Sequence, residues 1–530
     1  MALTLRKPVA WSAPLPRARS GKRGGGLRAR MLIGALLCAP LAAHGAEKAP
    51  ADKAASPAKP FAFEDVREQA KALAAKPFAP PPESLPEALK SLTDEQYRDI
   101  RFKPDAALWR NDDLPIQVEF VHLGPAFRAP VPLNIVVGGK LQPVRYDPAL
   151  FEFGRNAFPK PLPGDLGFAG FRLTAPLRRS DAYEPFALFL ETGAVSAIGA
   201  GGRFGASARG LAIDTGLADG AETPAFRAFW IEKPDPAASE VVVYALLDSP
   251  SATGAYRFAI CPGLRTVMAV TADLFFRRDV AKLGIAPVAS MFFHGENAER
   301  RFDDFRPEAH GSDGLLVDAG REWIWRPLQN PAKSQLNSFH AADLQGFGLL
   351  QRDRDFGHYQ DLDAGFQDRP SLWVDPIGDW GEGDAHLVEA PAEGDGGDNV
   401  LAFWWPRDPA KAGEERRFAY RLIFTPDMLD RPPLGRATAT RIGARDKGGR
   451  LFVIDFDHVP IAAAPAAIDA AISTSAGQIV DSRTRRNPET GGWRTSFELA
   501  PEGDKPIELR CYLKSGDDIL TETWSYQWSR

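Results

Sequence analysis

The stretch EVVVYALLDSPSATGAYRFAICPGLRTVMAVT, residues 240–271, contains three short runs rich in β-branched and aromatic residues, separated by Pro, Gly and Ser. Such runs are typical of β-strands bounded by turns. The same texture continues on the N-terminal side, and the expected strands together are Ile116–Leu123, Leu133–Val137, Glu240–Leu247, Ala255–Cys261 and Thr266–Thr271. Helical segments do not alternate with these runs, so a parallel α/β fold is disfavoured. The sequence therefore predicts an all-β fold of antiparallel sheets packed as a sandwich.

A second group of expected strands follows a break at Thr425–Gly435, TPDMLDRPPLG. These strands are Leu451–His458, Gln478–Thr484, Trp493–Leu499, Ile507–Lys514 and Leu520–Trp528. A hairpin turn is expected at Asn487–Gly492. This number of strands in so short a segment predicts a small immunoglobulin-like sandwich.

Short helices are expected ahead of the first strands. Glu64–Ala75 places Val66, Ala70 and Leu73 on one face and ends before Pro77, as in an amphipathic helix. Thr93 and Gln96 have the spacing of a capping box at the start of another short helix. The preceding segment 46–60 is rich in Ala, Lys and Pro and predicts a flexible lead-in.

Residues 1–45 have the pattern of a cleavable secretory signal peptide. They carry eight basic and no acidic residues, and the apolar run Met31–Ala43 is followed by small residues near Gly45–Ala46. That run is too short to span a bilayer, although an uncleaved short anchor is the alternative. Two cysteines follow the leader, Cys261 and Cys511, which either form one bridge or remain free thiols.

Charge and motifs exclude several functions. Residues 46–530 carry 56 basic and 69 acidic residues, a formal charge of −13, which disfavours nucleic-acid or anionic-membrane binding. The Gly-rich segment Gly193–Gly210 matches no dinucleotide, Walker or nucleophile-elbow pattern. His-Glu-x-x-His is absent, and two cysteines are too few for a cysteine zinc site. The sequence therefore predicts neither a cofactor nor a metal ion.

Residues 291–405 combine tryptophans with carboxylates, as expected for a cleft that binds an uncharged carbohydrate. Aromatic rings stack on sugar C–H faces, and carboxylates accept hydrogen bonds from hydroxyls. The expected substrate-binding residues are Trp323, Trp325, Arg326, His358, Tyr359, Trp373, Trp380, Asp304 and His310. Strand alternation places Trp323 and Trp325 on one face and Ile324 and Arg326 on the other. The alternative is that the tryptophans belong to the hydrophobic core.

The chain from about Phe61 to Trp528 resembles the periplasmic glucans biosynthesis proteins G and D, and protein G more than protein D. The segments that carry the resemblance are DLGFAGF (Asp165–Phe171), ARGLAID (Ala208–Asp214), FWIE (Phe229–Glu232), YALLDSPSATGAY (Tyr244–Tyr256), REWIWRPL (Arg321–Leu328), GFGLLQR (Gly346–Arg352), RPSLWV (Arg369–Val374) and TETWSYQ (Thr521–Gln527). The resemblance implies a large sandwich of the galactose-mutarotase-like supersandwich type, at 61–426, a linker at 427–437 and the immunoglobulin-like domain at 438–530. It also implies a periplasmic location and a β-1,2-linked glucan as ligand.

The resemblance implies catalytic positions as well. Members of the family are regarded as inverting β-1,2-glucan hydrolases, as transglycosylases, or as biosynthesis factors alone. An inverting glycosidase uses one carboxylic acid and one carboxylate base. The acid corresponds to Asp398, with Asp395 as a nearby helper that raises the pKa of Asp398. The base position, directly after His310, holds Gly311, and Phe366 stands where some relatives carry a Tyr. Asp313 or Asp304 would have to act as the base.

Three functional hypotheses follow. The first is a periplasmic glucan biosynthesis factor that binds the nascent β-1,2-glucan with little turnover, which Gly311 favours. The second is an inverting β-1,2-glucanase or transglycosylase with Asp398 as the general acid. The third is an interaction module, in which residues 438–530 dock a membrane glucan glucosyltransferase.

Overall fold

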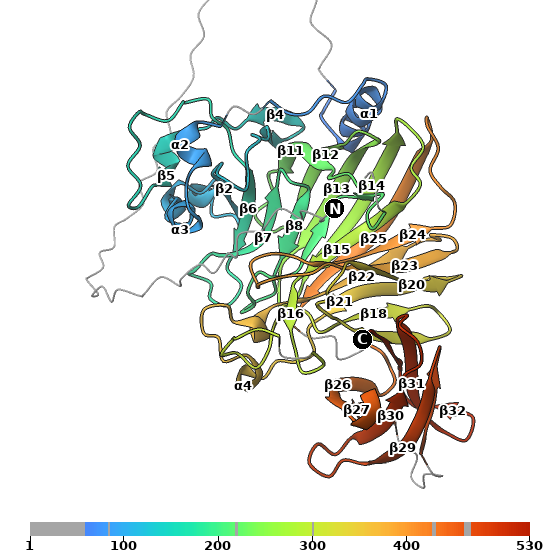
Figure 1. The fold of residues 1–530 in the computed structure, drawn as a ribbon. Coiled ribbons are helices and arrows are strands. Elements are labelled where there is room, and N and C mark those ends of the chain that lie inside the picture. The colour runs from blue at the N-terminus through green and yellow to red at the C-terminus, as the bar shows by residue number, and fades with distance from the viewer. Residues whose placement is uncertain (1–58, 83–84, 218–220, 299–300, 427–430, 461–467) are drawn as a thin grey trace, which may run out of the picture.

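The computed structural model describes residues 59–82, 85–217, 221–298, 301–426, 431–460 and 468–530. The chain begins with helix α1 (Phe63–Ala74), followed by the short helices α2 (Glu87–Lys90) and α3 (Asp94–Arg98). Figure 1 shows these helices at the edge of a large β-structure. The capping box predicted at Thr93 and Gln96 is confirmed, because each side chain hydrogen-bonds the backbone N–H of the other. The predicted leader, 1–45, lies outside the described residues.

Two large sheets form most of the molecule and pack face to face. In the described residues the smaller sheet has ten strands, in the order β2 (Gln117–Val121), β6 (Gly170–Ala175), β7 (Glu184–Leu190), β8 (Ala194–Ala197), β9 (Ser207–Arg209), β15 (Leu283–Ser290), β24 (Val400–Pro406), β23 (Gly383–Glu389) and β20 (Gln335–Ala341), with β10 (Ala212–Ile213) paired to β15. The core between the sheets is rich in Phe. The rings of Phe171 and Phe189 stack with centroids 5.0 Å apart, and Phe189 meets Phe258 of the other sheet edge-on at 5.2 Å. The predicted all-β sandwich is confirmed.

The larger sheet contains residues 240–271, whose sequence pattern predicts an all-β fold. Residues 240–271 form β12, β13 and the start of β14, paired antiparallel in sequence order. From one edge, the described strands of this sheet are β4 (Lys140–Pro143), β3 (Leu133–Val137), β11 (Ala225–Glu232), β12 (Val241–Asp248), β13 (Ala252–Cys261), β14 (Thr266–Phe276), β25 (Glu415–Thr425), β22 (Ser371–Ile377), β21 (Gly346–Leu350), β18 (Gly314–Asp318), β19 (Trp323–Pro327), β33 (Thr523–Trp528), β31 (Ile507–Ser515) and β28 (Asp469–Thr474), with β32 (Asp518–Ile519) paired to β31.

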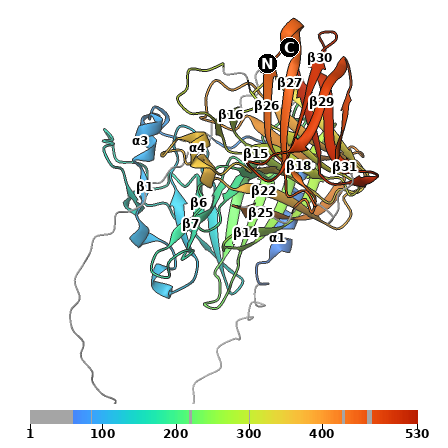
Figure 2. The same ribbon diagram turned by 90° about the horizontal axis from the view of Figure 1, so that it is seen from below.

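The C-terminal strands form a small sandwich that shares this larger sheet. One of its sheets consists of β26 (Arg436–Ala444), β27 (Arg450–Asp457), β30 (Trp493–Ala500) and β29 (Gln478–Arg486). The opposite sheet, β28-β31-β33, continues directly into the large sandwich, because β33 pairs parallel with β19 through Ile324–Thr523 and Trp325–Trp524. Figure 2 shows the C-terminal strands standing on the end of the large sandwich. Strand β26 begins at Arg436, inside the linker predicted for 427–437.

A second hydrophobic core lies where the C-terminal sandwich covers the larger sheet. Trp325 and Trp373 of the large sandwich pack there with Phe452, Phe497 and Trp524 of the C-terminal strands. The predicted alternation along β19 is confirmed, since Trp323 and Trp325 contact this second core whereas Ile324 belongs to the main core. The face that carries the tryptophans is therefore covered by protein.

Smaller elements complete the described fold. Two-stranded pairs are formed by β1 (Arg101–Phe102) with β5 (Phe151–Glu152) and by β16 (Phe292–His294) with β17 (Ala309–His310). The short helix α4 (Phe356–Tyr359) follows β21. Single 3₁₀ turns lie at Pro104–Ala106, Arg110–Asp112, Pro148–Leu150, Phe366–Asp368 and Asp446–Gly448.

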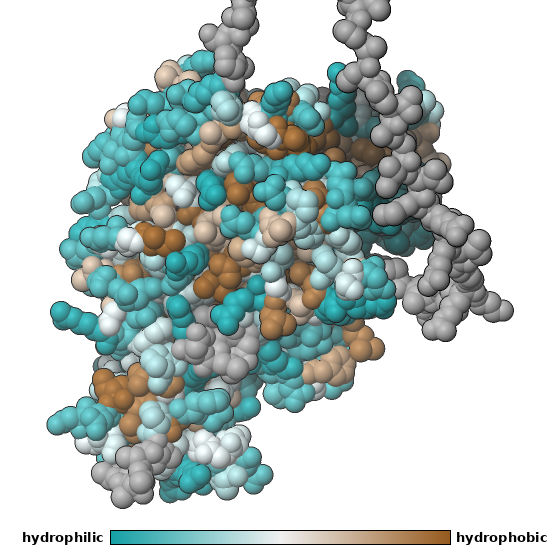
Figure 3. Space-filling model, turned by 180° about the vertical axis from the view of Figure 1, so that it is seen from behind, coloured by the Kyte–Doolittle hydropathy of each residue, from teal (hydrophilic) through white to brown (hydrophobic). Residues whose placement is uncertain are grey.

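The face of the molecule opposite to that in Figure 1 is largely polar. Hydrophilic residues cover most of the face in Figure 3, and hydrophobic ones are scattered among them singly or in small groups. None of the helices in the described ranges combines the length and the apolar character needed to cross a bilayer. Cys261 is exposed and Cys511 is buried, and both are free thiols.

Candidate functional site

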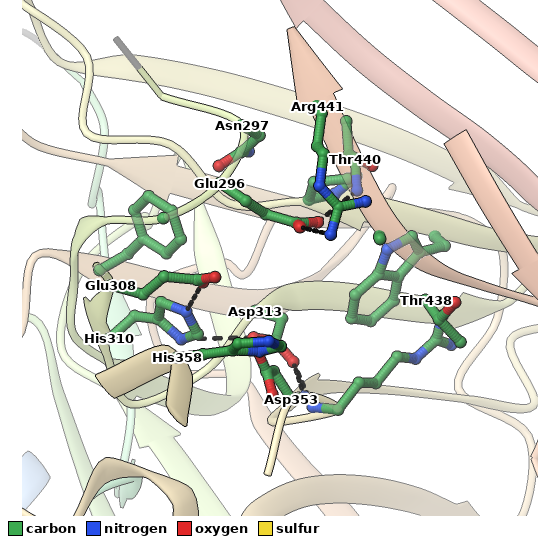
Figure 4. A pocket seen from close by; sticks show the side chains of 16 residues that line it. Glu296, Asn297, Glu308, His310, Asp313, Asp353, His358, Thr438, Thr440 and Arg441 are labelled. Carbon is green, nitrogen blue, oxygen red and sulfur yellow. Dashed lines mark hydrogen bonds and ion pairs between the residues drawn. The ribbon is translucent and has the colours of Figure 1, made fainter. Parts of the chain in front are cut away.

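A pocket of about 240 Å³ lies where the large sandwich meets the C-terminal sandwich. We call it the junction pocket. Figure 4 shows that its polar side chains form two groups, with Glu308, His310, Asp313, Asp353 and His358 facing Glu296, Thr440 and Arg441. Its full lining is Phe292, Gly295, Glu296, Asn297, Glu308, His310, Asp313, Trp325, Pro327, Arg352, Asp353, His358 and Thr438 to Arg441. Both sandwiches therefore contribute to one polar cavity.

His310 organises the first group of side chains. Its ring is almost completely buried, with 1% exposure. Its Nε2 lies 2.9 Å from a carboxylate oxygen of Glu308, and its Nδ1 lies 3.3 Å from Asp313. Burial opposes protonation of the imidazole, but the contacts with these two carboxylates outweigh burial and raise the pKa of His310. His310 is therefore favoured as a cation that donates from both ring nitrogens.

His358 stands beside this group at the mouth of the pocket. Helix α4 carries it, and half of its side chain is exposed. Its Nδ1 is in a short contact with Asp353, and this hydrogen bond raises the pKa of His358 although burial lowers it. The Glu308 amide donates to the His358 carbonyl at 2.9 Å, and the Asp353 amide donates to Asp313 at 2.7 Å. The two imidazoles and three carboxylates are thus connected in one network.

Glu296 belongs to the opposite wall. Its carboxylate accepts from the Thr440 amide at 2.5 Å and pairs with Arg441 at 2.8 Å. Burial raises the pKa of Glu296 to about 7 despite these two favourable contacts, and the charges of Glu308 and Asp313 add to the effect. A carboxyl group with such a pKa can exist in either protonation state near neutral pH.

Arg352 and Trp325 close the pocket on the side of the larger sheet. The Arg352 guanidinium lies 3.5 Å from the centre of the Trp325 ring. It also forms two hydrogen bonds with Glu522, at 2.5 and 2.9 Å. One face of the Trp325 ring is therefore occupied by a cation of the protein.

Asp398 lies in a separate cluster beside strand β9. Only 9% of Asp398 is exposed. Its carboxylate accepts from Ser207 at 3.3 Å and pairs with Arg209 at 3.4 Å. Burial raises the pKa of Asp398 against the opposing effects of Arg209, Ser207 and Arg369. A buried carboxyl group with a raised pKa is suited to hold a proton and donate it to a leaving group.

Gly311 lies beside the Asp398 cluster, because it packs against Arg369. A Cβ atom added at Gly311 would lie 3.2 Å from a guanidinium nitrogen of Arg369, and one added at Gly205 would lie 2.6 Å from its Cδ. The guanidinium is stacked 4.3 Å above Phe366, and its Nε has no hydrogen-bond partner among the described atoms. Because His310 lines the junction pocket while Gly311 faces Arg369, these neighbouring residues face two different clusters.

Arg306 connects three further acidic residues. Its guanidinium lies 2.7 Å from Asp304, 3.0 Å from Asp361 and 2.6 Å from Asp395. The hydrogen bonds from Arg306 hold the pKa of Asp304 well below its usual range. Asp395, expected to raise the pKa of Asp398, is thus paired with a cation, and Asp304 is kept ionised by the same arginine. Asp313, the other substitute base, belongs to the junction pocket.

Of the sequence-predicted binding residues, His310, Trp325 and His358 line the junction pocket, together with Asp313. Tyr359 is buried behind it, and its hydroxyl accepts from Gln351 at 2.7 Å. Arg326 is buried against Glu508, 2.9 Å away. Trp373 is fully buried, Trp323 stacks on it at 6.0 Å, and Trp380 is 8% exposed. These last four residues do not line the pocket.

Several residues of the two clusters were not expected from the sequence. They are Glu296, Glu308, Arg352, Asp353, Thr438, Thr440, Arg441, Ser207, Arg209 and Arg369. The β26 residues lie more than 120 positions from Glu308 and His310, and the fold alone brings them together. One local signal concerns Glu308. It lies two residues before His310 on an extended segment, and this spacing places both side chains on the same face.

Comparison with known proteins identifies the family. Residues 61–528 match the model of a family described as "Periplasmic glucan biosynthesis protein, MdoG". The chain is 45% identical to Glucans biosynthesis protein G of Bradyrhizobium diazoefficiens over 90% of this chain and 95% of that one. It is also 45% identical to the protein G of Rhodopseudomonas palustris over 94% and 99% of the two chains. For Glucans biosynthesis protein D 1 of Ralstonia nicotianae the identity is 43% over 90% and 93%. The chain belongs to the periplasmic glucan biosynthesis protein family.

Proposed function

We propose that this protein binds the β-1,2-linked glucan backbone during periplasmic glucan biosynthesis, and that the junction pocket holds one glucosyl unit of it. Family membership implies the periplasmic location and the role in glucan biosynthesis. The linkage is implied by the resemblance described above. Export by the Sec-type leader at 1–45 is part of the same proposal, and this leader lies outside the described residues.

The observation that carries the proposed binding is the polar lining of the junction pocket from both walls. Carboxylates and two imidazoles approach from one side, and the Thr438 hydroxyl and Arg441 approach from the other. This mixture of acceptors and donors suits the hydroxyl groups of an uncharged sugar. The volume of about 240 Å³ is below the roughly 300–1,000 Å³ of pockets for drug-sized ligands, so one sugar ring fits better than several.

Calorimetric titration of the purified chain with linear β-1,2-glucooligosaccharides tests the proposal. Ala439 lines the pocket on β26 and is half-buried, so Ala439→Trp fills the cavity without removing a charged group. We expect at least a tenfold loss of affinity for Ala439→Trp and little change for Ala439→Ser. Equal affinity in wild type and Ala439→Trp would place the glucan elsewhere.

A second candidate function is glucan cleavage or transglycosylation with Asp398 as the general acid. The raised pKa and burial of Asp398 favour it. The glycine at position 311 opposes it, because this position then supplies no carboxylate. Incubation with linear β-1,2-glucan followed by product analysis tests this function. Shorter or cyclised products should form with wild type and with the exposed control Asp279→Asn, and Asp398→Asn should abolish them. Unchanged substrate with wild type would exclude turnover.

The docking of a membrane glucosyltransferase by residues 438–530 stays a prediction.

A further inference from the structure

Glu308, Asp353 and His358 form a group of potential metal ligands on one wall of the junction pocket. One donor atom from each side chain can be chosen so that all three lie within 4.8 Å of one another. The residues come from three separate places in the chain, just before β17, after β21 and on α4. Figure 4 shows their side chains on the same side of the cavity. The fold therefore brings Glu308 together with Asp353 and His358, which lie only five residues apart in the sequence.

No lysine or arginine among the described residues forms an ion pair with the carboxylates of this wall. Within the described part of the chain, the ion-pair partners of Glu308, Asp353 and Asp313 are the imidazoles of His310 and His358. The two arginines that line the pocket are engaged elsewhere. Arg352 pairs with Glu522, and Arg441 pairs with Glu296 and Asp455. A protonated His310 offsets part of the charge of the three carboxylates, and one bound cation would offset the rest.

The carboxylate of Glu308 is held in place by the buried side chain of His310. His310, at 1% exposure, binds one oxygen of Glu308 through Nε2 and faces Asp313 and Gln351 through Nδ1. The other oxygen of Glu308 is not used in this contact. Metal ligands commonly have such an outer hydrogen-bond partner, which fixes their orientation. His310 would play this part without being a ligand itself.

We propose that Glu308, Asp353 and His358 bind one divalent cation of the Zn²⁺ type in the junction pocket. One nitrogen and two carboxylate oxygens form a ligand set that Zn²⁺ accepts, whereas Ca²⁺ prefers oxygen ligands alone. The adjoining cavity leaves room for water to complete the coordination. Three protein ligands with an open position are the arrangement of catalytic zinc sites, in contrast to closed structural ones.

Binding requires the hydrogen bond between His358 and Asp353 to open and the three side chains to turn toward one ion. Bonds from Zn²⁺ to nitrogen and oxygen are roughly 2.0–2.2 Å long, so donors at one ion lie closer than the present limit of 4.8 Å. The side chain of His358 is 50% exposed and that of Asp353 is 20% exposed, so both have room to rotate. Glu308, whose side chain is 10% exposed, is the fixed member of the set.

The chain offers a matched control for the imidazole. His340 is a second histidine with two carboxylates nearby, Glu382 at 3.5 Å and Asp384 at 3.4 Å. It lies on β20, away from the pocket, and its side chain is 55% exposed. If cations were only attracted to surface carboxylates, both histidines would contribute to Zn²⁺ binding. If the three residues form a specific site, only His358 would contribute.

The proposal does not depend on glucan binding, because the test uses metal ions alone. The purified chain is treated with a chelator, dialysed and titrated calorimetrically with Zn²⁺ and, separately, with Ca²⁺ at pH 7.5. We expect one equivalent of Zn²⁺ and binding of Ca²⁺ at least tenfold weaker. Substitution of Co²⁺ for Zn²⁺ should give a visible d–d absorption band at the same stoichiometry.

The variants decide whether the site is the one proposed. His358→Ala and Glu308→Gln should each weaken Zn²⁺ binding at least tenfold and remove the Co²⁺ band, and His340→Ala should change neither. Circular dichroism and thermal unfolding check that the variants fold. If one of them does not fold, Asp353→Asn is tested in its place. The proposal is overturned if wild type binds no Zn²⁺, or if His358→Ala and Asp353→Asn bind it as tightly as wild type does.

Discussion

Arg352 of the large sandwich and Glu522 of the C-terminal sandwich form a buried, bidentate ion pair across the junction. The side chain of Glu522 is completely buried, and that of Arg352 is 12% exposed. Arg352 also donates to the Ala437 carbonyl at 2.7 Å, and Glu522 accepts from the Ala437 amide at 2.8 Å. The pair therefore fixes the start of strand β26 to the larger sheet, and β26 carries one wall of the pocket.

Removal of one partner should destabilise the protein strongly. Glu522→Gln leaves the Arg352 charge buried without a counter-charge, so we expect a loss of about 3–5 kcal/mol in the free energy of unfolding. Chemical denaturation measures this loss. The double variant Arg352→Met with Glu522→Leu should recover part of it, because no unpaired charge remains. Lys411→Gln, in an exposed pair with Asp279, should change stability little. An effect of Glu522→Gln no larger than that of Lys411→Gln would contradict the prediction.

Glu296 should make the stability of the protein depend on pH. Its pKa of about 7 in the folded state exceeds the ordinary value of 4.5, so the folded state binds this proton more tightly than the unfolded state does. The stabilising contribution of Glu296 to the free energy of unfolding is therefore present at low pH and is lost as the pH rises from about 4.5 to 7. At roughly 1.4 kcal/mol per pH unit, and with allowance for partial exposure, the loss is about 2–3 kcal/mol.

Denaturation at pH 5 and at pH 7.5 measures this effect. Glu296→Gln cannot titrate, so its unfolding free energy should fall less over this range than that of wild type. Glu389, which burial shifts in the same direction, remains in both proteins and cancels in the comparison. The same pH dependence in both proteins would mean that Glu296 does not titrate in this range.

Gly311→Asp should increase glucan hydrolysis if Asp398 is a general acid. The added carboxylate would lie beside Arg369, within the cluster of Asp398, at the position where the family resemblance implies a base. Contacts of 3.2 Å with Arg369 and with the Ser290 hydroxyl require these side chains to give way by a few tenths of an ångström. Release of reducing sugar from linear β-1,2-glucan should rise at least tenfold over wild type. Gly311→Ala, which adds bulk without charge, serves as the control. Equal rates for Asp and Ala would exclude a role as base.

Trp373 should contribute chiefly to stability. Its indole is fully buried between Trp323 and Arg431, whose guanidinium lies 5.3 Å from the ring centre. Trp373→Ala should cost about 3–5 kcal/mol of unfolding free energy. Trp373→Phe keeps most of the packing and should leave affinity for β-1,2-glucooligosaccharides unchanged. A large loss of affinity in a stable Trp373→Phe protein would restore the sugar-binding role predicted from the sequence.

The two sandwiches should unfold together. Strands β19 and β33 are bonded through their backbones, and Trp325 and Trp524 belong to one core. Calorimetry should therefore give a single transition. Residues 438–530 made alone would expose the edge of β33 and are expected to aggregate, because an uncovered strand edge pairs with other chains. Two separate transitions, or a soluble and folded fragment, would refute this prediction.

The sequence predicted most strands because their periodicity and bounding turns are local signals. Leu133–Val137 was predicted with its observed bounds, and residues 240–271 form the expected strands. The pairing of β19 with β33 was not predicted, since nothing local in residues 323–327 specifies a partner some 200 positions away. For the same reason the tryptophan face of β19 was interpreted as a sugar platform, whereas it lies against the C-terminal sandwich.

The candidate site was predicted in part. His310, Asp313, Trp325 and His358 were identified from the clustering of aromatic and acidic residues, and all four line the pocket. Glu296, Glu308 and Arg441 were missed, because a carboxylate in a loop or a guanidinium on the outer face of a strand is usually solvated. The ligand-like group of Glu308, Asp353 and His358 has no sequence spacing typical of a metal motif. Only the three-dimensional arrangement makes it recognisable.

The backbone pairing of β19 with β33 also sets an order of events during synthesis. Residues 323–327 are made long before residues 523–528, so the ribosome must add about 200 further residues before β19 can acquire this neighbour. Until residues 523–528 are in place, β19 has an open edge, and the indoles of Trp323 and Trp325 are uncovered. The last six strand residues to be made, 523–528, are therefore the ones that close this edge.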